Sequence, residues 1–556
     1  MLEKAKKPEF MELLRRDEKY TWFRETVHEK WREYGEKDVP MLTYGMFQAF
    51  FETGSRQIFG EGFFLRRRQL GSSAWMALLY PEDERYFKKL LDVIWAILDE
   101  YTWTPPEHIQ FCVGAPEQDI DLFASETAQQ LAEISELFGD RLPETVRQRI
   151  DRELEHRTVQ GYLHNTYLWE NVENNWAMVC LCGVVSVILH LHPEMIDGLL
   201  PRILSTVRTY VGTYQQDGVC IEGLGYWNYG MSKYAVMTDL ILEHTGGRVD
   251  LFAEMGNGEK RRNMLTFNRH MSLGHGLSVS FDDVGMAVAN NAYLLYYLRR
   301  RYPEIVTFSK EDNLFTQSNC DLFSTVLREA MWYMPTPEKA ADASYEECHM
   351  AETGWFVKTT PRYGFAAKGG RHEKPYHADL GAFMLASDGV RFITDPGAGE
   401  YTKDYFAKRY ANFHVSSRGH SVPIVDGQYQ VGEETRTAET RFENGVFSID
   451  LSNAYPADDL TMRRKFTFGE DRVVLEDRWA FAERDKSVTE RFVTMIKPEI
   501  TEDGVRIGSV LLRADTENVH ITEEHPGREA TYYCIDYDPA PGAQSFRMEM
   551  FVGEGK

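Results

Sequence analysis

The stretch WAMVCLCGVVSVILHL, residues 176–191, is the most apolar run in the sequence, and polar residues flank it at Asn174-Asn175 and at His192-Pro193. A helix that crosses a bilayer needs about 20 apolar residues, so this run is too short to span a membrane comfortably. A helix that is apolar on all sides has to be surrounded by other elements of a large core. The stretch therefore predicts a buried helix inside a helical domain.

The residues around this stretch support a helical domain. Apolar residues repeat near every 3.6 positions in four further segments, and several of these end at Gly or are followed by Pro. Successive helices joined by short links indicate stacked helical hairpins, either a toroid or a solenoid. The four segments are residues 84–103, 121–139, 195–214 and 234–247.

After Pro335 the apolar period changes from helical spacing to alternation, which is typical of strands. Asp-Gly and Gly-Glu-Asp turns separate the alternating runs, as in antiparallel hairpins. These runs are residues 354–370, 381–395, 463–481 and 499–515. We expect a multidomain α+β protein with a helical domain over residues 1–335 and an antiparallel β-sandwich over residues 345–556.

Length and net charge limit the number of domains and the kinds of binding partner that the chain can have. At 556 residues the chain is too long for one core, which predicts two or three domains. The formal net charge of −24 argues against nucleic acid as a partner, because a phosphate backbone is bound by clustered Lys and Arg. Basic clusters at residues 66–68 and from Arg371 to Arg418 leave a local anion-binding cleft open, whereas residues 299–301 are expected on a solvated helix face.

The cysteines and the first twenty residues indicate where in the cell the protein is found. The seven cysteines form no CxxC pair, which gives no sign of a zinc ribbon or a redox site. The first twenty residues lack the apolar core of a signal peptide. We expect a cytoplasmic protein with no membrane contact, and a homodimer is left open.

The passage DGVCIEGLGYWNYG, residues 217–230, places four glycines, one glutamate and three aromatic residues between two helical stretches. Aromatic core packing on flexible backbone would explain it. A bend that presents Glu222, Trp227 and Tyr229 to a ligand would explain it as well.

Motifs from Trp103 to Gln430 resemble those of the heparinase II/III-like polysaccharide lyases, which act on heparin, chondroitin, hyaluronan or oligoalginate. No single motif is specific, but their order and spacing are. The motifs are WTPPEHIQ, DIDLFASETAQQLAEI, ENNWAMVC, DGVCIEGLGYWNYG, YHADLGAF, ITDPGAGEYT and RGHSVPIVDGQYQ. The resemblance implies an incomplete (α/α) toroid followed by a β-sandwich, and cleavage of an acidic polysaccharide or oligosaccharide.

β-Elimination at a uronic acid needs a group that withdraws charge from the carboxylate, a base for the C5 proton and an acid for the leaving oxygen. The family resemblance implies that an amide before a helix and a tyrosine one helical hairpin later fill the first two roles. The matching residues are Asn175 and Tyr229, which are 229 − 175 = 54 positions apart. A helix cap is the alternative for Asn174 and Asn175.

The resemblance implies the other site residues too. Asn174, Glu222, Trp227 and Tyr376 are expected to bind substrate. His377, Asp395 and His420 are expected to hold a structural or accessory divalent metal, zinc or manganese, which two imidazoles and a carboxylate suit.

One motif departs from the family. Many relatives have His-x-His-x-Asp where this chain has Pro375-Tyr376-His377-Ala378-Asp379, so the first histidine is missing. His372 is our candidate for the missing catalytic group. Tyr376, His414 or Tyr229 itself, acting as both base and acid, remain alternatives.

Two other classes of function stay open on the same scaffold. A glycoside hydrolase needs two carboxylates flanking the bond, and Glu222 with Asp282 or Asp283 could supply them. A noncatalytic carbohydrate-binding protein is the third reading, against which the matched Asn175, Glu222 and Tyr229 argue.

Overall fold

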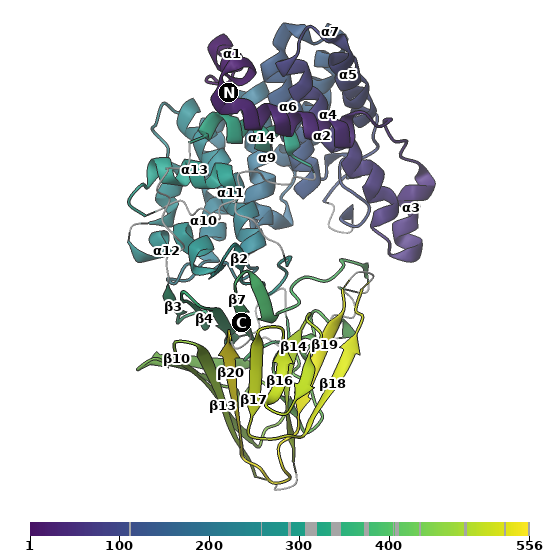
Figure 1. The fold of residues 1–556 in the computed structure, drawn as a ribbon. Coiled ribbons are helices and arrows are strands. Elements are labelled where there is room, and N and C mark those ends of the chain that lie inside the picture. Colours follow the sequence, from purple (N-terminus) through teal and green to yellow (C-terminus); the bar gives the residue numbers. More distant parts are fainter. Residues whose placement is uncertain are drawn as a thin grey trace.

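Figure 1 shows a computed structural model in which helices form one domain and strands the other. It describes residues 1–109, 113–256, 258–286, 291–305, 320–334, 346–371, 377–403, 405, 411–432, 435–482, 486–527 and 530–553. Among these residues, no helix is both long enough and apolar enough to pass through a membrane.

The N-terminal domain is built from helices of very different lengths. They are α1 (Pro8–Arg16), α2 (Thr21–Lys30), α3 (Tyr44–Thr53), α4 (Gln57–Leu79), α5 (Glu84–Leu98), α6 (Leu122–Phe138), α7 (Glu144–Leu154), α8 (Gln160–His164), α9 (Trp176–Leu191), α10 (Ile196–Gly212), α11 (Leu224–His244), α12 (Glu259–His270), α13 (Ala292–Arg301) and α14 (Leu322–Trp332).

Contacts between these helices run around a ring. Helix α4 packs on α6, α6 on α9, α9 on α11, α11 on α13, α13 on α14, and α14 returns to α4. Helices α5, α7, α10 and α12 each pack on one member of the ring, namely α4, α6, α9 and α11. The pattern is an α/α toroid, and it confirms the expected fold of this domain.

Helix α9 is formed by the apolar stretch of residues 176–191. Its residues from Ala177 to Leu189 are all buried, as an inner helix of the ring requires. Gly183 lies so close to α6 that a Cβ atom there would stand 2.4 Å from the carbonyl oxygen of Ser125. The glycine therefore permits the tight contact between α6 and α9.

Some strands alternate buried and exposed side chains, and others are buried throughout. In the toroid domain they are β1 (Ser272–Gly274) and β2 (Leu277–Ser278). The C-terminal domain contains β3 (Glu347–Met350), β4 (Trp355–Thr359), β5 (Gly364–Lys368), β6 (Gly370–Arg371), β7 (Phe383–Ser387), β8 (Val390–Ile393), β9 (Ile424–Val425), β10 (Thr437–Glu443), β11 (Val446–Asp450), β12 (Leu460–Phe468), β13 (Arg472–Phe481), β14 (Val488–Thr494), β15 (Glu499–Thr501), β16 (Gly504–Ile507), β17 (Val510–Ala514), β18 (Val519–Glu524), β19 (Tyr532–Tyr537) and β20 (Ser545–Val552).

These strands form antiparallel sheets with a shared core. The largest sheet has the order β15-β16-β17-β20-β13-β12-β11-β10-β6, and smaller sheets have the orders β3-β4-β5-β7-β8 and β18-β19-β14-β9. Phe365 of the second sheet contacts Phe466 of the first, and Phe383 contacts Phe492 of the third, with ring centroids 4.9 and 5.9 Å apart. The predicted antiparallel β-sandwich is confirmed.

Two details differ from the sequence-based expectations. Arg66 and Arg67 lie on the inner helix α4, where both bind Glu100 in the interior, so they do not form an anion-binding cleft. Helix α11 begins at Leu224, ten residues before the expected segment, and takes in the aromatic end of the glycine-rich passage. The boundary between the domains falls at residues 335–345, outside the described residues, and stays a prediction.

Candidate active site

Asn175 is bound to Glu222 at the start of α9. Its backbone N–H donates to Glu222 Oε2 over 3.0 Å, and its Nδ2 donates to Oε1 at 3.0 Å and to Oε2 at 3.2 Å. Asn175 is 2% exposed, and its Oδ1 atom has no hydrogen-bond partner among the described residues. The side chain is thus held by a carboxylate and does not cap the helix.

Asn174 takes the capping role. Its Oδ1 accepts a hydrogen bond from the backbone N–H of Trp176 at 3.0 Å. This contact satisfies one of the backbone donors left open at a helix start. The cap interpretation therefore fits Asn174 and not Asn175, and the structure gives no sign of the substrate-binding role expected for Asn174.

Glu222 is a carboxyl group with an altered acidity. The pKa of Glu222 is raised to about 7, by burial first and also by the charge of Asp283, while the hydrogen bonds from Asn175 lower it. At neutral pH the group therefore carries only part of its negative charge.

Gly223 fixes the bend that follows Glu222. Its φ of +89° lies in the left-handed region, and a Cβ atom there would stand 2.2 Å from Val284 Cγ2. Only glycine allows this approach. The bend brings the start of α11 against residues 280–286, here called the interdomain segment.

The interdomain segment makes several contacts from the toroid into the β-sandwich. Asp282 accepts a hydrogen bond from Lys368 Nζ at 2.6 Å, and Lys368 also donates to Asp379 at 2.9 Å. Asp283 Oδ1 lies 3.1 Å from His377 Nε2 and accepts a short hydrogen bond from the Tyr405 hydroxyl. The site is therefore assembled from both domains.

A pair of phenols lies beside this segment. The Tyr226 and Tyr401 hydroxyls are 3.0 Å apart, and the Tyr401 ring packs on Tyr405 with centroids 5.0 Å apart. Burial raises the pKa of Tyr226, and the charges of Asp283 and Glu222 contribute to the increase while Arg56 opposes it. Tyr226 thus shares one electrostatic environment with Glu222 and Asp283.

Tyr229, one turn further along α11, points to the interior of the toroid. Its hydroxyl donates to Glu126 Oε1 on α6 at 2.8 Å, and its side chain is partly exposed. Burial raises the pKa of Tyr229 well above its usual value, and the neighbouring carboxylates of Glu126 and Asp321 raise it further. The lowered pKa that the base role requires is not present in this resting arrangement.

Trp227 was expected to bind substrate, and the structure contradicts this. Its side chain is 0% exposed, and its indole Nε1 donates to the carbonyl of Met264 at 2.8 Å. On a helix, residues 226 and 229 share a face while residue 227 points elsewhere, in this case into the core. Trp227 is a packing residue.

The histidine and tyrosine expected upstream of His377 cannot be placed. His372 and Tyr376 both lie outside the described residues. His414, the other candidate acid, is partly buried beside Gly399, where a Cβ atom would stand 3.0 Å from its Nδ1. Burial, together with the nearby His420 and His377, lowers the pKa of His414 to about 4, so the ring is neutral at physiological pH.

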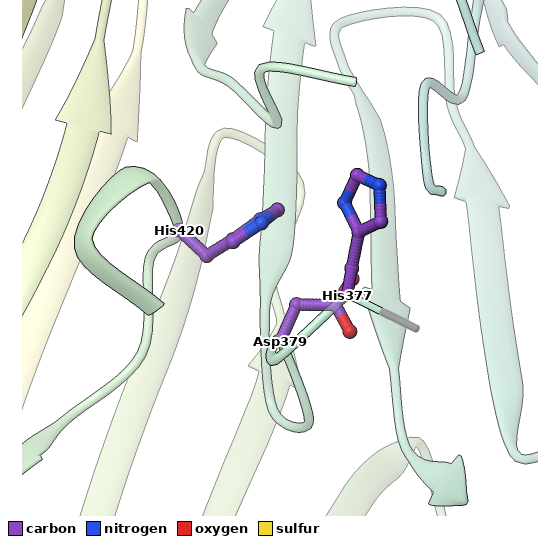
Figure 2. Close-up of side chains that lie close together, drawn as sticks. All are labelled: His377, Asp379 and His420. Carbon is purple, nitrogen blue, oxygen red and sulfur yellow. The ribbon is translucent and has the colours of Figure 1, made fainter. Parts of the chain in front are cut away.

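Two buried histidines and an aspartate form a cluster in the β-sandwich. Figure 2 shows His377 and Asp379 on one segment, facing His420 on another. The ligand atoms of these three residues lie within 4.8 Å of one another. Of the expected set, His377 and His420 belong to this cluster, Asp379 supplies its carboxylate, and the expected Asp395 lies 2.9 Å from His420 Nδ1.

Several residues of this site were not predicted from the sequence as part of it. Tyr226 could have been found, because it lies in the same passage as Glu222 and on the same helix face as Tyr229. Tyr401 and Tyr405 lie far from residues 222–229 in sequence, and only the fold brings them to Tyr226 and Asp283. Asp283 was considered only as a hydrolase carboxylate, and Glu126 lies among apolar residues of α6 that gave no sign of a site.

Comparisons with known proteins agree with this architecture. Residues 346–545 match the family described as heparinase II/III-like, C-terminal. Comparison of the sequence with curated proteins found no match.

Solved structures share the fold across nearly the whole chain. A crystal structure of heparinase III has a TM-score of 0.65 at 11% identity, covering 99% of this chain and 92% of that one. A heparan sulfate lyase HepC mutant from Pedobacter heparinus has a TM-score of 0.57 at 15% identity, covering 96% and 84%. The Streptomyces coelicolor A3 chondroitin AC lyase, in complex with chondroitin sulphate, has a TM-score of 0.55 at 11% identity, covering 97% and 80%. Residues 346–545 therefore match the heparinase II/III-like C-terminal model, and the chain as a whole shares the toroid-and-sandwich fold of these solved lyase structures.

Proposed function

We propose that the protein is a polysaccharide lyase that cleaves a uronic-acid-containing polysaccharide or oligosaccharide by β-elimination and leaves a 4,5-unsaturated uronate end. The similar structures named above are those of heparan sulfate and chondroitin lyases. Glycosaminoglycans such as hyaluronan, chondroitin and heparan sulfate are the first substrates to consider, with alginate as a further one.

The Asn175–Glu222 pair is the observation that carries this proposal. Glu222 holds the Asn175 amide in one orientation beside the interdomain segment. An amide nitrogen carries two hydrogens, so Nδ2 can donate to a substrate carboxylate as well as to Glu222. That hydrogen bond strengthens as C5 loses its proton and the carboxylate gains enolate character. The partly neutral Glu222 also reduces repulsion of an anionic sugar.

Tyr229 is our proposed base, because its hydroxyl rests on a carboxylate that can accept a proton, whereas Tyr226 faces another phenol. As a phenolate, Tyr229 removes the C5 proton, and the electrons form the C4–C5 double bond as the C4–O bond breaks. The same proton then passes to the leaving glycosidic oxygen, so that no further acid is needed. Tyr226 and Tyr401, whose hydroxyls meet at the junction of the domains, would contact the sugar.

A divalent metal is the proposed accessory group. The Oδ1 atom of Asp379 is buried and has no hydrogen-bond partner among the described residues, as an unused ligand atom would. His377, Asp379 and His420 would hold zinc or manganese, with Asp395 beside them. The metal would supply a fixed positive charge that ties the sandwich loops together next to the toroid.

The hydrolase alternative is weaker in this geometry. Both oxygens of Glu222 accept hydrogen bonds from Asn175, Asp282 is paired with Lys368, and Asp283 is shared by His377 and Tyr405. A general acid in a glycosidase needs its proton directed at the leaving oxygen. Each of these three carboxylates is thus already engaged by protein donors at one or both of its oxygens.

A substrate panel tests the proposal. Purified protein is incubated with hyaluronan, chondroitin, heparan sulfate and alginate, each as polymer and as short oligosaccharide, and absorbance is followed at about 232 nm, where an unsaturated uronate absorbs. We expect absorbance to rise with at least one substrate. New reducing ends without absorbance would establish a hydrolase, and neither signal would favour a binding protein.

A further inference from the structure

A buried cluster of charged side chains lies directly behind Tyr229. Glu126 Oε1 accepts the Tyr229 hydrogen bond and lies 3.2 Å from Lys233 Nζ. Lys233 also donates to Asp321 Oδ2 at 2.6 Å and to Gln129 Oε1 at 3.3 Å. Glu126, Lys233 and Asp321 come from α6, from α11 and from the residue before α14, and each is less than 8% exposed.

This cluster has an unbalanced charge. It holds two carboxylates and one ammonium group in the interior, where an unpaired charge is costly. A proton on one carboxylate would bring the cluster to neutrality. Lys233 lies closer to Asp321 than to Glu126, so Glu126 is the carboxylate that gains most from the proton.

Glu126 is also the carboxylate that touches the proposed base. A proton shared over 2.8 Å between two oxygen atoms can move from one to the other without any change of the fold. We propose that Glu126 is a positioning residue for the lyase reaction, and that it accepts and returns the hydroxyl proton of Tyr229 so that a phenolate is available next to the substrate. This inference rests on the proposed function of Tyr229.

The proton balance is simple. The Tyr229 O–H bond breaks and an O–H bond forms at Glu126, which leaves a phenolate hydrogen-bonded to a neutral acid. The phenolate takes the C5 proton and gives it to the leaving oxygen, after which Glu126 can return its own proton to Tyr229. No proton enters or leaves the protein during the cycle.

The other titratable groups around the cluster do not replace Glu126. The pKa of Glu126 is raised to about 8, by burial first and then by the charge of Asp321, while Lys233 and Tyr229 lower it. Glu133 of α6 forms its own ion pair with Arg328 of α14 at 2.6 Å, and the neutral amide of Gln129 stands between Glu133 and Lys233. Other titratable groups facing the cluster, among the residues that the structure describes, include Cys180 and Cys182 of α9, Tyr293 of α13 and Cys320, all buried and all with raised pKa values.

The pH dependence of kcat/KM tests the inference. The active form has lost one proton from the Tyr229–Glu126 pair, so wild-type activity should rise with pH through about 8, the pKa of Glu126. Glu126→Gln removes the proton acceptor. Its activity at neutral pH should fall by about 100-fold, a typical contribution of acid–base catalysis, and its inflection should move toward the higher pKa of Tyr229 alone.

Asp321→Asn should act in the opposite direction. It removes the negative charge that raises the pKa of Glu126, so the inflection should move to lower pH. This second variant also keeps the test decisive if Glu126→Gln does not fold, as judged by circular dichroism and melting temperature.

Glu133→Gln is the matched control, with the same substitution on the same buried helix face, and its inflection should stay at the wild-type pH. Unchanged inflections in both Glu126→Gln and Asp321→Asn, with absorbance still produced, would overturn the role of Glu126 and leave the lyase proposal intact. A wild-type protein that gives no absorbance at about 232 nm would instead overturn the proposed function.

Discussion

Asn175 and Glu222 are joined through both the backbone and the side chain of the asparagine. Three hydrogen bonds of 3.0 to 3.2 Å connect them across 47 positions of sequence. Such a pairing fixes the rotamer of the amide before any ligand arrives, which is how a protein arranges its dipoles in advance of a reaction.

Asn175→Ala should therefore lower kcat by about 100-fold or more and change KM much less, because the amide stabilises charge that develops only in the transition state. Asn174→Ala is the control. It removes the cap on α9 and should cost about 1 kcal/mol of stability with little effect on kcat/KM. Steady-state kinetics and thermal melts of both variants show which asparagine acts in catalysis and which in helix stability. If Asn175→Ala lowers only stability and Asn174→Ala lowers kcat, Asn175 is the structural residue.

Tyr229→Phe should abolish elimination, with a loss of at least about 100-fold in kcat, because it removes the proton carrier. Tyr226→Phe should mainly raise KM, since it breaks only the contact with Tyr401 at the domain junction. Both changes delete one hydroxyl and leave the ring in place, so melting temperatures should stay close to wild type. If Tyr226→Phe is the inactive variant, the base is Tyr226.

Metal analysis should find about one zinc or manganese per chain, as a single site implies. His420→Ala should lose the metal and several degrees of melting temperature, because the metal links separate loops of the sandwich. Asp379→Asn and Asp395→Asn, compared side by side, show which carboxylate is the ligand, since only that variant should lose the metal. If purified wild-type protein contains no metal and a chelator does not change its melting temperature, the proposed metal site is wrong.

His270 should make the stability of the domain junction depend on pH. Burial lowers the pKa of His270, but hydrogen bonds with Cys348 and Glu346 outweigh it and raise the value to about 9. The stabilisation is therefore complete below the unfolded value of about 6.5 and is lost as pH rises through about 9. It is on the order of 1–3 kcal/mol.

Melting curves of wild type and His270→Gln at several pH values check this. The wild type should be the more stable protein near pH 6, and the gap should narrow by about pH 10 as the imidazolium is lost. A gap that does not depend on pH would mean that the histidine contributes by packing alone.

The sequence predicted the domain types well because both depend on local periodicity. The α9 stretch and the alternating runs after Pro335 carry their structure in their spacing. The bend at Gly223 was also predictable as a bend, since it belongs to a passage with four glycines.

Contacts between distant segments were not predictable in the same way. Nothing in the motif YHADLGAF marks Asp379 as a metal ligand. Its position beside His420 depends on how two loops of the sandwich meet. Trp227 was misassigned because the helix start was placed too late. With α11 beginning at Leu224, helical spacing puts Trp227 on the core face and Tyr226 and Tyr229 on another.

The interdomain segment limits how this protein can be divided or recombined. Asp282 has a φ of +64°, and its carboxylate is neutralised by a lysine of the other domain. A toroid expressed by itself would expose Asp282 and Asp283 without their partners, and a separate sandwich would leave Lys368 with one counterion fewer. A chimaera that exchanges sandwiches between relatives must therefore exchange residues 280–286 with them, although this segment precedes the apparent boundary by about fifty positions.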